Sequence, residues 1–180
     1  GPVPVATYLA TDGTASVPGT LTLNVTPLND NPAAVNDANS VPINTAVSGN
    51  VLGNDSDLDG DALAVSGFSV AGIPGSFAPG ATAAIPGVGT LLINADGSYT
   101  FTPAANYNGP IPVATYAITD GNGGSASATL TLTMGPNNPP VATDAAFPAT
   151  EDTPVAGNLL PNDTDPDGNP LVVTGFSLPG

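Results

Sequence analysis

The stretch IPVATYAITDGNGGSASATLTLTM, residues 111–134, contains two runs in which apolar and polar side chains alternate. A period of two predicts β-strands with one buried and one solvated face. The Gly- and Asn-rich sequence DGNGG separates the two runs, so we predict an antiparallel hairpin. The side chains expected to face a core are Ala114, Tyr116, Ile118, Ala126, Ala128, Leu130, Leu132 and Met134.

Short apolar segments upstream of this hairpin predict further strands, because turn-forming Gly, Pro, Asn and Asp residues separate them. About seven short antiparallel strands in roughly 100 residues are typical of an immunoglobulin-like or cadherin-like β-sandwich. The Gly-, Ala- and Pro-rich stretch 70–88 is predicted to be a surface loop. The upstream strands are expected at residues 34–37, 46–52, 63–69, 90–94 and 98–102.

The chain repeats itself at an offset of 108 residues. GPVPVATY at residue 1 returns as GPIPVATY at residue 109, and ALAVSGFS at residue 62 returns as PLVVTGFS at residue 170. Insertions between these anchors are small, as expected of loops between strands. We therefore predict tandem sandwiches. The last strands of one repeat are expected at 1–28, a linker at 29–33, a complete repeat at 34–134, a linker at 135–140 and the first strands of another repeat at 141–180.

The charge balance is one-sided, because the chain has 15 acidic residues, no Lys, Arg or His, and a net charge of −15. With 41% hydrophobic residues, it is too apolar to be kept disordered by that charge. The missing basic residues and cysteines remove the usual general bases, phosphate-binding groups, zinc ligands and disulfides. Nucleic acid and anionic membranes are therefore not expected as partners. No apolar run reaches the ~20 residues of a membrane-spanning helix, and the first residues lack the pattern of a signal peptide.

An acid-rich loop occurs twice, as NDSDLDGDAL from residue 54 and NDTDPDGNPL from residue 162. Each copy puts three carboxylates at alternate positions ahead of a glycine. Several oxygen ligands on a flexible loop favour Ca²⁺. The loops do not match an EF-hand, because their twelfth positions are Ser66 and Thr174 rather than Glu. The alternative is that they are polar turns whose Asp and Asn side chains cap backbone groups.

Four segments together resemble the calcium-dependent cadherin-like repeats of large bacterial repeats-in-toxin-type surface adhesins and biofilm proteins. They are NDNPAAVND from residue 29, VLGNDSDLDGDALAV from residue 51, ADGSYTFTPAANYNGPIPVATYAITDGNGG from residue 95, and SATLTLT after it. The resemblance implies an extracellular sandwich whose linker, here Asn29, Asp30 and Asn31, helps to bind calcium between domains. The chain departs from the pattern at Pro27, at NNPP from residue 137, and at Ile43 and Asn44, which replace the acidic pair seen as Glu151 and Asp152.

Sandwich topology predicts that separate acids meet at one end of the complete repeat. In an immunoglobulin-type fold, the loop between the second and third strands lies beside the last hairpin turn and the entry of the first strand. The calcium ligands predicted there are Asp30, Asp37, Asp55, Asp57, Asp59, Asp61 and Asp120, with Asn29 and Asn31 from the linker. At the next junction they are Asp163, Asp165 and Asp167 with Asn137, Asn138 and Asp144. Asp12, Glu151 and Asp152 are further candidates, the last two towards the opposite end of their repeat.

These observations predict a structural spacer in an extracellular adhesin or surface fibre, in which calcium stiffens the junctions between neighbouring repeats. One alternative is a module of the same fold that binds polysaccharide or a partner protein through residues 70–88. Another is a filament subunit joined to other copies by strand sharing, since residues 1–27 and 139–180 would carry open strand edges. Catalysis is not expected, because the chain has a single Glu and no Trp or Arg with which to build a sugar cleft.

Overall fold

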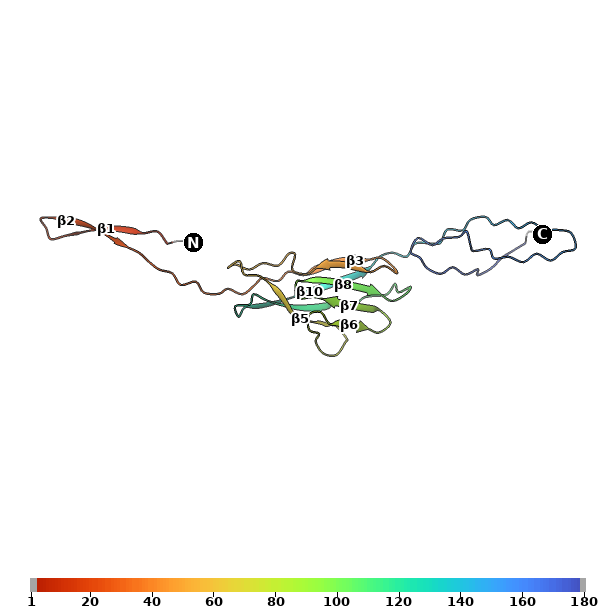
Figure 1. Cartoon of the computed structure of the whole chain (residues 1–180), viewed down its shortest axis with the longest axis horizontal. Helices are drawn as coiled ribbons and strands as arrows, with labels where there is room; N and C mark the ends of the chain where they lie inside the picture. The colour runs from red at the N-terminus through yellow and green to blue at the C-terminus, as the bar shows by residue number, and fades with distance from the viewer. Residues whose placement is uncertain (1–2, 179–180) are drawn as a thin grey trace.

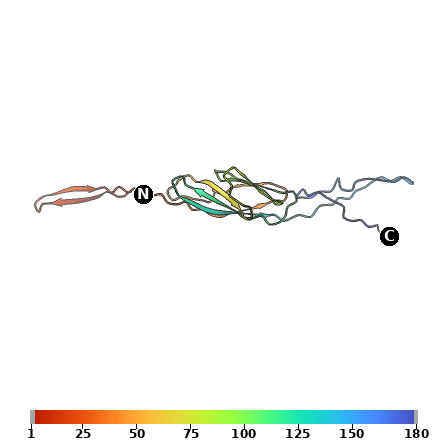
Figure 2. The ribbon, with the colours of Figure 1, turned by 90° about the horizontal axis from the view of Figure 1, so that it is seen from below.

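The computed structural model describes residues 3–178 as an elongated molecule with three parts along one axis (Figures 1 and 2). A two-stranded hairpin lies at one end, a β-sandwich in the middle, and a segment of mostly irregular chain at the other end. All regular elements of the described residues are strands, so the predicted all-β class is confirmed. No helix among residues 3–178 is long and apolar enough to cross a membrane.

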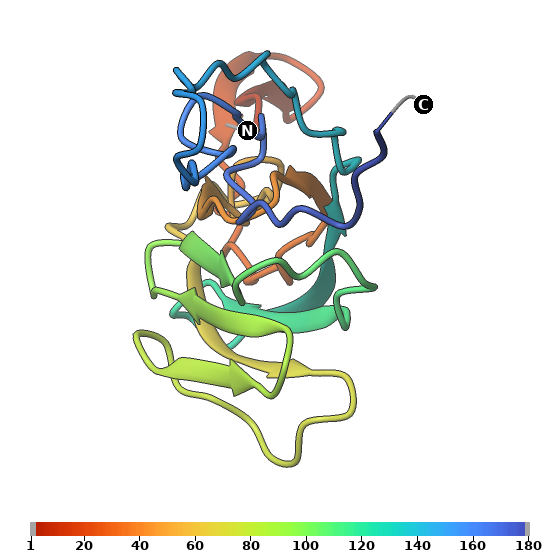
Figure 3. The same ribbon diagram turned by 90° about the vertical axis from the view of Figure 1, so that its right-hand side faces the viewer.

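The central sandwich consists of two four-stranded sheets, seen end-on in Figure 3. One sheet has the order β3-β10-β9-β5 and the other β4-β8-β7-β6. Neighbouring strands are antiparallel except for β3 and β10, which pair in parallel. The chain therefore enters and leaves the sandwich at opposite ends. The strands are β3 (Asp37–Val41), β4 (Val47–Asn50), β5 (Ala64–Val70), β6 (Thr82–Ile85), β7 (Gly89–Ile93), β8 (Ser98–Pro103), β9 (Ala114–Thr119) and β10 (Ser125–Met134).

Inward-facing side chains of both sheets fill the sandwich. On β9 and β10 alternate residues are buried, and Tyr116, Ile118 and Leu130 are at most 1% exposed. The alternation predicted for residues 111–134 is thus confirmed. Phe101 and Ile93 face them from the other sheet and are fully buried. Burial of each large apolar side chain contributes about 1.5–3 kcal/mol, so this core is the main source of stability.

The first strand begins later than its sequence predicts. Residues 34–37 were expected to be a strand, but β3 starts only at Asp37. The preceding backbone pairs with the first acid loop instead, because Ala33 forms an isolated β-bridge with Ser56 and the Val35 amide donates to Asp55 at 2.7 Å. The backbone of residues 33–35 therefore bonds to the acid loop instead of extending β3 in its sheet.

The stretch 70–88 is also more ordered than a surface loop, which corrects that prediction. It contains β6, which brings the sandwich to eight strands instead of about seven. Phe77 exchanges two backbone hydrogen bonds with Phe68, of 2.7 Å and 3.0 Å, and their rings stack with centroids 5.2 Å apart. Since β5 is an edge strand, this bridge covers part of an edge that would otherwise be open to pairing.

The parts on either side of the sandwich expose many of their apolar side chains. The hairpin pairs β1 (Ala6–Thr11) with β2 (Ser16–Leu21) in antiparallel register. Leu9 and Val17 in it are 70% and 64% exposed. Residues 139–178 form an isolated bridge between Val141 and Thr164. The packed core of the described chain therefore lies in the central sandwich.

Candidate metal centre

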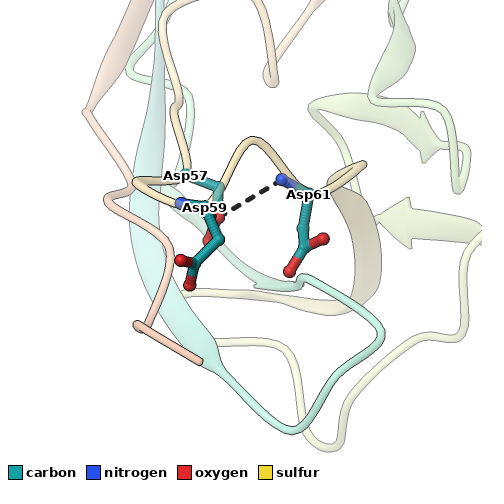
Figure 4. Close-up of side chains that lie close together, drawn as sticks. All are labelled: Asp57, Asp59 and Asp61. Carbon is teal, nitrogen blue, oxygen red and sulfur yellow. Dashed lines mark hydrogen bonds between the residues drawn. The ribbon is translucent and has the colours of Figure 1, made fainter. Parts of the chain in front are cut away.

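The first acid loop, residues 54–61, turns back on itself at Asp57. Oδ1 of Asp57 accepts hydrogen bonds from the backbone amides of Asp59, at 2.8 Å, and Asp61, at 3.3 Å. Gly60 adopts a φ of 81°, a left-handed conformation that costs glycine nothing sterically. The loop thus curls around Asp57, and the three labelled carboxylates lie side by side (Figure 4) instead of pointing to alternate faces as in a strand.

Oxygens of Asp57, Asp59 and Asp61 lie within 4.8 Å of one another. Two unit charges about 4 Å apart repel by about 1–4 kcal/mol, depending on whether water or the protein surface screens them. The chain has no basic side chain to offset this repulsion. Oδ2 of Asp57 is in addition buried without a hydrogen-bond donor from the described residues. A buried carboxylate oxygen without a donor destabilises the fold, and a bound cation would satisfy it.

The linker closes one side of this cluster. The backbone amide of Asp30 donates to Oδ2 of Asp59 at 2.7 Å. From the last hairpin turn, the side-chain amide of Asn122 donates to Oδ2 of Asp61 at 2.7 Å. A hollow of about 430 Å³ is lined by residues 27–29, Asp59, Asp61 and Asn122. Linker, acid loop and hairpin turn therefore meet around one hollow.

Asp120 anchors the linker to the hairpin turn and is only 4% exposed. Its Oδ2 accepts a hydrogen bond of 2.8 Å from Nδ2 of Asn29. Its Oδ1 accepts hydrogen bonds of 2.8 Å and 2.9 Å from the backbone amides of Asn122 and Gly124. The hydrogen bond from Asn29, followed by those from the backbone, holds the pKa of Asp120 below its ordinary value of 3.8, although burial opposes the shift. Asp120 is therefore ionised at neutral pH.

Asp37 and Asp55 form a second, deeper group around the Tyr116 hydroxyl. The hydroxyl oxygen lies 2.8 Å from Oδ2 of Asp37 and 3.4 Å from Oδ2 of Asp55. It also lies 3.0 Å from the carbonyl oxygens of Val35 and Val51. Burial raises the pKa of Tyr116. Burial and the charge of Asp55 also raise the pKa of Asp37, although the hydrogen bond from Tyr116 opposes that shift. This core tyrosine thus holds both carboxylates and the backbone beside the acid loop.

The second acid loop repeats the backbone hydrogen bonds of the first, with Asn169 in the place of Asp61. Gly168 has a φ of 71°, close to that of Gly60. Oδ1 of Asp165 accepts the backbone amides of Asp167 and Asn169, as Asp57 does in the first loop. The Thr143 amide donates to Asp163 at 2.7 Å, as the Val35 amide does to Asp55. The Asn138 amide donates to Asp167 at 2.6 Å, as the Asp30 amide does to Asp59.

Other predicted ligands stay apart from these clusters. Asp12 caps its own turn, where the backbone amide of Ala15 and groups of Thr14 lower its pKa to about 2. Glu151 and Asp152 lie in the turn 150–153, and within residues 3–178 neither shares a hydrogen bond with an acid loop. Two of the predicted ligands, Asp144 and Asn31, have no side-chain hydrogen bond to a described residue. Asp144 offers a backbone carbonyl to Asn162.

Sequence reasoning did not identify three asparagines that the structure brings to the junctions. Asn122 bonds to Asp61, and Asn106 and Asn169 both bond to Asn44. One signal was available for Asn169, because it stands at the repeat offset from Asp61. Asn106 and Asn122 lie in turns, where Asn is common for reasons unrelated to ligands.

Two sheets with parallel first and last strands, and an acid cluster where the linker enters, define a cadherin-like β-sandwich module. Residues 29–136 match the sequence model of the bacterial cadherin-like domain, and because this is more than half of the chain, the chain belongs to that family. Residues 137–180 match the sequence model of the bacterial Ig domain. Domains of these two families are usually extracellular or surface-exposed and are typically non-catalytic, and cadherin-like domains generally bind calcium.

Comparison with solved structures adds no functional argument. A nucleoside hydrolase-related hypothetical protein from Saccharophagus degradans that is associated with carbohydrate metabolism is 16% identical over 59% of this chain, with a TM-score of 0.39. The present chain spans 26% of the length of that protein's chain. No curated protein shows a significant match.

Proposed function

We propose that the chain is a calcium-stabilised spacer module of a long extracellular adhesin or surface fibre, with calcium bound where each linker meets an acid loop. The observation that carries this proposal is the convergence of Asp57, Asp59 and Asp61 beside the linker, with a buried oxygen of Asp57 left without a donor among the described residues. Membership of the bacterial cadherin-like family supports the choice of ion.

The donor atoms at the first junction suit calcium. Ca²⁺ takes about six to eight oxygen ligands in flexible geometry, whereas Mg²⁺ demands a small octahedron and keeps much of its water. Carboxylate and amide oxygens on loops meet the first requirement. The proposed ligands of one or more ions are Asp57, Asp59 and Asp61, together with Asp30, Asp37, Asp55, Asp120, Asn29 and Asn31. At the second junction the proposed set is Asp163, Asp165, Asp167, Asn138 and Asp144.

At the first junction, the role of the ion would be to fix the linker. Without a cation, the carboxylates of Asp57, Asp59 and Asp61 repel one another and loosen the loop to which the Asp30 amide is bonded. A bound cation removes that repulsion and holds loop and linker together. The chain's own residues supply the rest of the geometry, because Asn29 and Asp120 already tie the linker to the hairpin turn.

Small-angle scattering and thermal unfolding with calcium, and then with chelator, test the proposal. We expect a higher Tm and a larger maximum dimension with calcium. An ion that binds only the folded state stabilises it by about 2.7 kcal/mol at 100 times its Kd. An equal concentration of magnesium should have a smaller effect. If neither Tm nor maximum dimension responds to calcium, the proposal is wrong.

A matched pair of charge-removing variants separates the site from general electrostatics. Asp57→Asn should weaken calcium binding, measured by titration calorimetry, by about tenfold or more. A tenfold change in Kd corresponds to about 1.4 kcal/mol, and the attraction between calcium and one ligand charge exceeds that value. Asp96→Asn removes the same charge from an exposed turn between β7 and β8 and should leave the affinity unchanged. Equal losses in the two variants would show that calcium responds only to net charge.

A further inference from the structure

At the end of the sandwich opposite the first acid loop, two asparagines lie in left-handed conformations. Asn44, between β3 and β4, has a φ of 59°, and Asn106, between β8 and β9, has a φ of 60°. Few residues other than glycine adopt such angles, although Asn does so more readily than most. The two residues support each other. The Asn106 backbone amide donates to Oδ1 of Asn44 at 2.6 Å, and Oδ1 of Asn106 lies 3.3 Å from Nδ2 of Asn44.

The same side chain of Asn44 crosses the junction to the second acid loop. Its Nδ2 donates to Oδ1 of Asn169 at 2.9 Å and to the backbone carbonyl of Asp167 at 3.0 Å. Asn169 in turn donates from Nδ2 to Oδ1 of Asn137 in the linker, at 2.8 Å. Asn106, Asn44, Asn169 and Asn137 thus form a continuous chain of amide groups, here called the amide clasp, from the sandwich to the next acid loop and its linker.

We propose that the paired asparagines Asn44 and Asn106 are a docking surface for the acid loop of the following module, and that the amide clasp keeps this junction aligned without a bound cation. Each group in the clasp is neutral, and each hydrogen bond has a donor and an acceptor. Repulsion between charges therefore does not oppose the contact, and salt does not screen it. The proposal is independent of calcium binding and goes beyond the spacer function.

The repeat itself shows which substitution would undo the clasp. At the repeat offset, Asp152 occupies the position of Asn44 and has almost the same φ, 62°. Asp61 likewise occupies the position of Asn169. An ionised aspartate at residue 44 would have only acceptor atoms to offer the Asp167 carbonyl and Oδ1 of Asn169. Amides at both positions allow direct contact, whereas acids there would require a cation between them.

Distance measurements between two nitroxide labels on the whole 180-residue chain test this proposal. The chain has no cysteine, so the pair Thr131→Cys and Thr153→Cys labels exposed sites on β10 and in the following segment. We expect a narrow distance distribution with calcium and an equally narrow one with chelator. Asn44→Ala should widen it in chelator, because loss of two hydrogen bonds lowers the docked-to-undocked ratio by about 10- to 100-fold. Asn44→Asp, which keeps the size of the side chain, should do the same.

The exposed residue Ser48 on β4 provides the matched control, and Ser48→Ala should leave the distribution narrow. A second label pair, Thr153→Cys with Thr174→Cys, reports on the following segment alone. Three results would overturn the proposal: widening of either label pair in the unsubstituted protein on chelation, a narrow distribution in Asn44→Ala, or a narrow distribution in Asn44→Asp. Failure of calcium to raise Tm would leave the proposal standing and refute only the spacer function.

Discussion

The side-chain amide of Asn29 donates a hydrogen bond of 2.8 Å to Oδ2 of Asp120, across 91 residues of chain. The contact joins the linker to the turn between β9 and β10. Because Asp120 is buried and its pKa is lowered, its charge is a permanent acceptor for that amide at neutral pH. The place at which the linker meets the sandwich is therefore fixed by residues of the chain itself.

The first prediction concerns this contact. Asn29→Ala should raise the pKa of Asp120 towards its ordinary value of 3.8, because Asn29 makes the largest contribution to lowering it. Carbon-13 NMR titration of the Asp120 carboxyl in chelator measures the change. Asn31→Ala is the matched control, since Asn31 makes no side-chain hydrogen bond to a described residue, and it should leave the pKa where it was. An unaltered pKa in Asn29→Ala would contradict the assignment of the cause.

The second prediction concerns the hydroxyl of Tyr116. Tyr116→Phe should lower the free energy of unfolding by about 1–3 kcal/mol, because two carbonyls and the Asp37 carboxylate lose their shared partner in a buried place. Tyr99→Phe should cost about 0.5–1.5 kcal/mol, since its hydroxyl has the single described partner Asn39. Urea unfolding of both variants in chelator measures the difference. Equal losses would show that the additional partners of the Tyr116 hydroxyl add nothing to stability.

The third prediction concerns pH. Hydrogen bonds from the side chain and backbone of Ser98 lower the pKa of Asp96 below 3.8. A carboxyl whose pKa is lower in the folded state binds fewer protons there than in the unfolded state at intermediate pH. Its stabilisation is therefore complete above pH 3.8 and is lost as pH falls through the folded pKa.

Asp96→Asn lacks this titration. In chelator, its Tm should lie below that of the unsubstituted protein near neutral pH, and the two should converge once the pH falls below the folded pKa of Asp96. Thermal unfolding across the acid range measures the gap. A gap that widens towards acid would show that ionised Asp96 does not stabilise the fold.

The fourth prediction concerns the bridge between Phe77 and Phe68. Phe77→Ala should speed hydrogen exchange at the Phe68 amide, because the stacked ring holds the carbonyl that accepts it. The stability loss should be about 2 kcal/mol, below the 3–5 kcal/mol of a fully buried phenylalanine, since Phe77 is half-buried. Ile73 is a half-buried neighbour whose backbone amide bonds to Val70 and not to Phe68, so Ile73→Ala should leave exchange at Phe68 slow. Unchanged exchange in Phe77→Ala would show that the backbone alone holds this segment.

Local pattern predicted the parts of the fold that depend on neighbouring residues. The alternation along β10 and the turn DGNGG specify which side chains face inward without any long-range information. The start of β3 could not be predicted in this way, because Ala33 and Val35 bond to a loop some 20 residues away. The pairing of Phe77 with Phe68 was concealed by the Gly and Pro residues around it.

The acidic residues of the cluster were predictable, but the residues that position them and the neighbouring module were not. The repeated spacing pointed to Asp57 and Asp59, and the turn at Gly60 follows from the same motif. The role of Tyr116 was not predictable, since its hydroxyl meets two separate segments, at residues 35–37 and at Val51, only after the core has packed. Nor was that of Asn44, whose partners Asp167 and Asn169 lie more than 100 residues further along the chain.

The parallel pair of β3 and β10 has a consequence for a chain under tension. The linker side of the sandwich leads into β3, and β10 leads out at the other end, with Leu130 opposite Asp37 and Met134 opposite Val41. A pull on both ends therefore drags the two strands past each other along their length. The hydrogen bonds between them are loaded in shear and must yield together, whereas a hairpin pulled from its open end unzips one bond at a time.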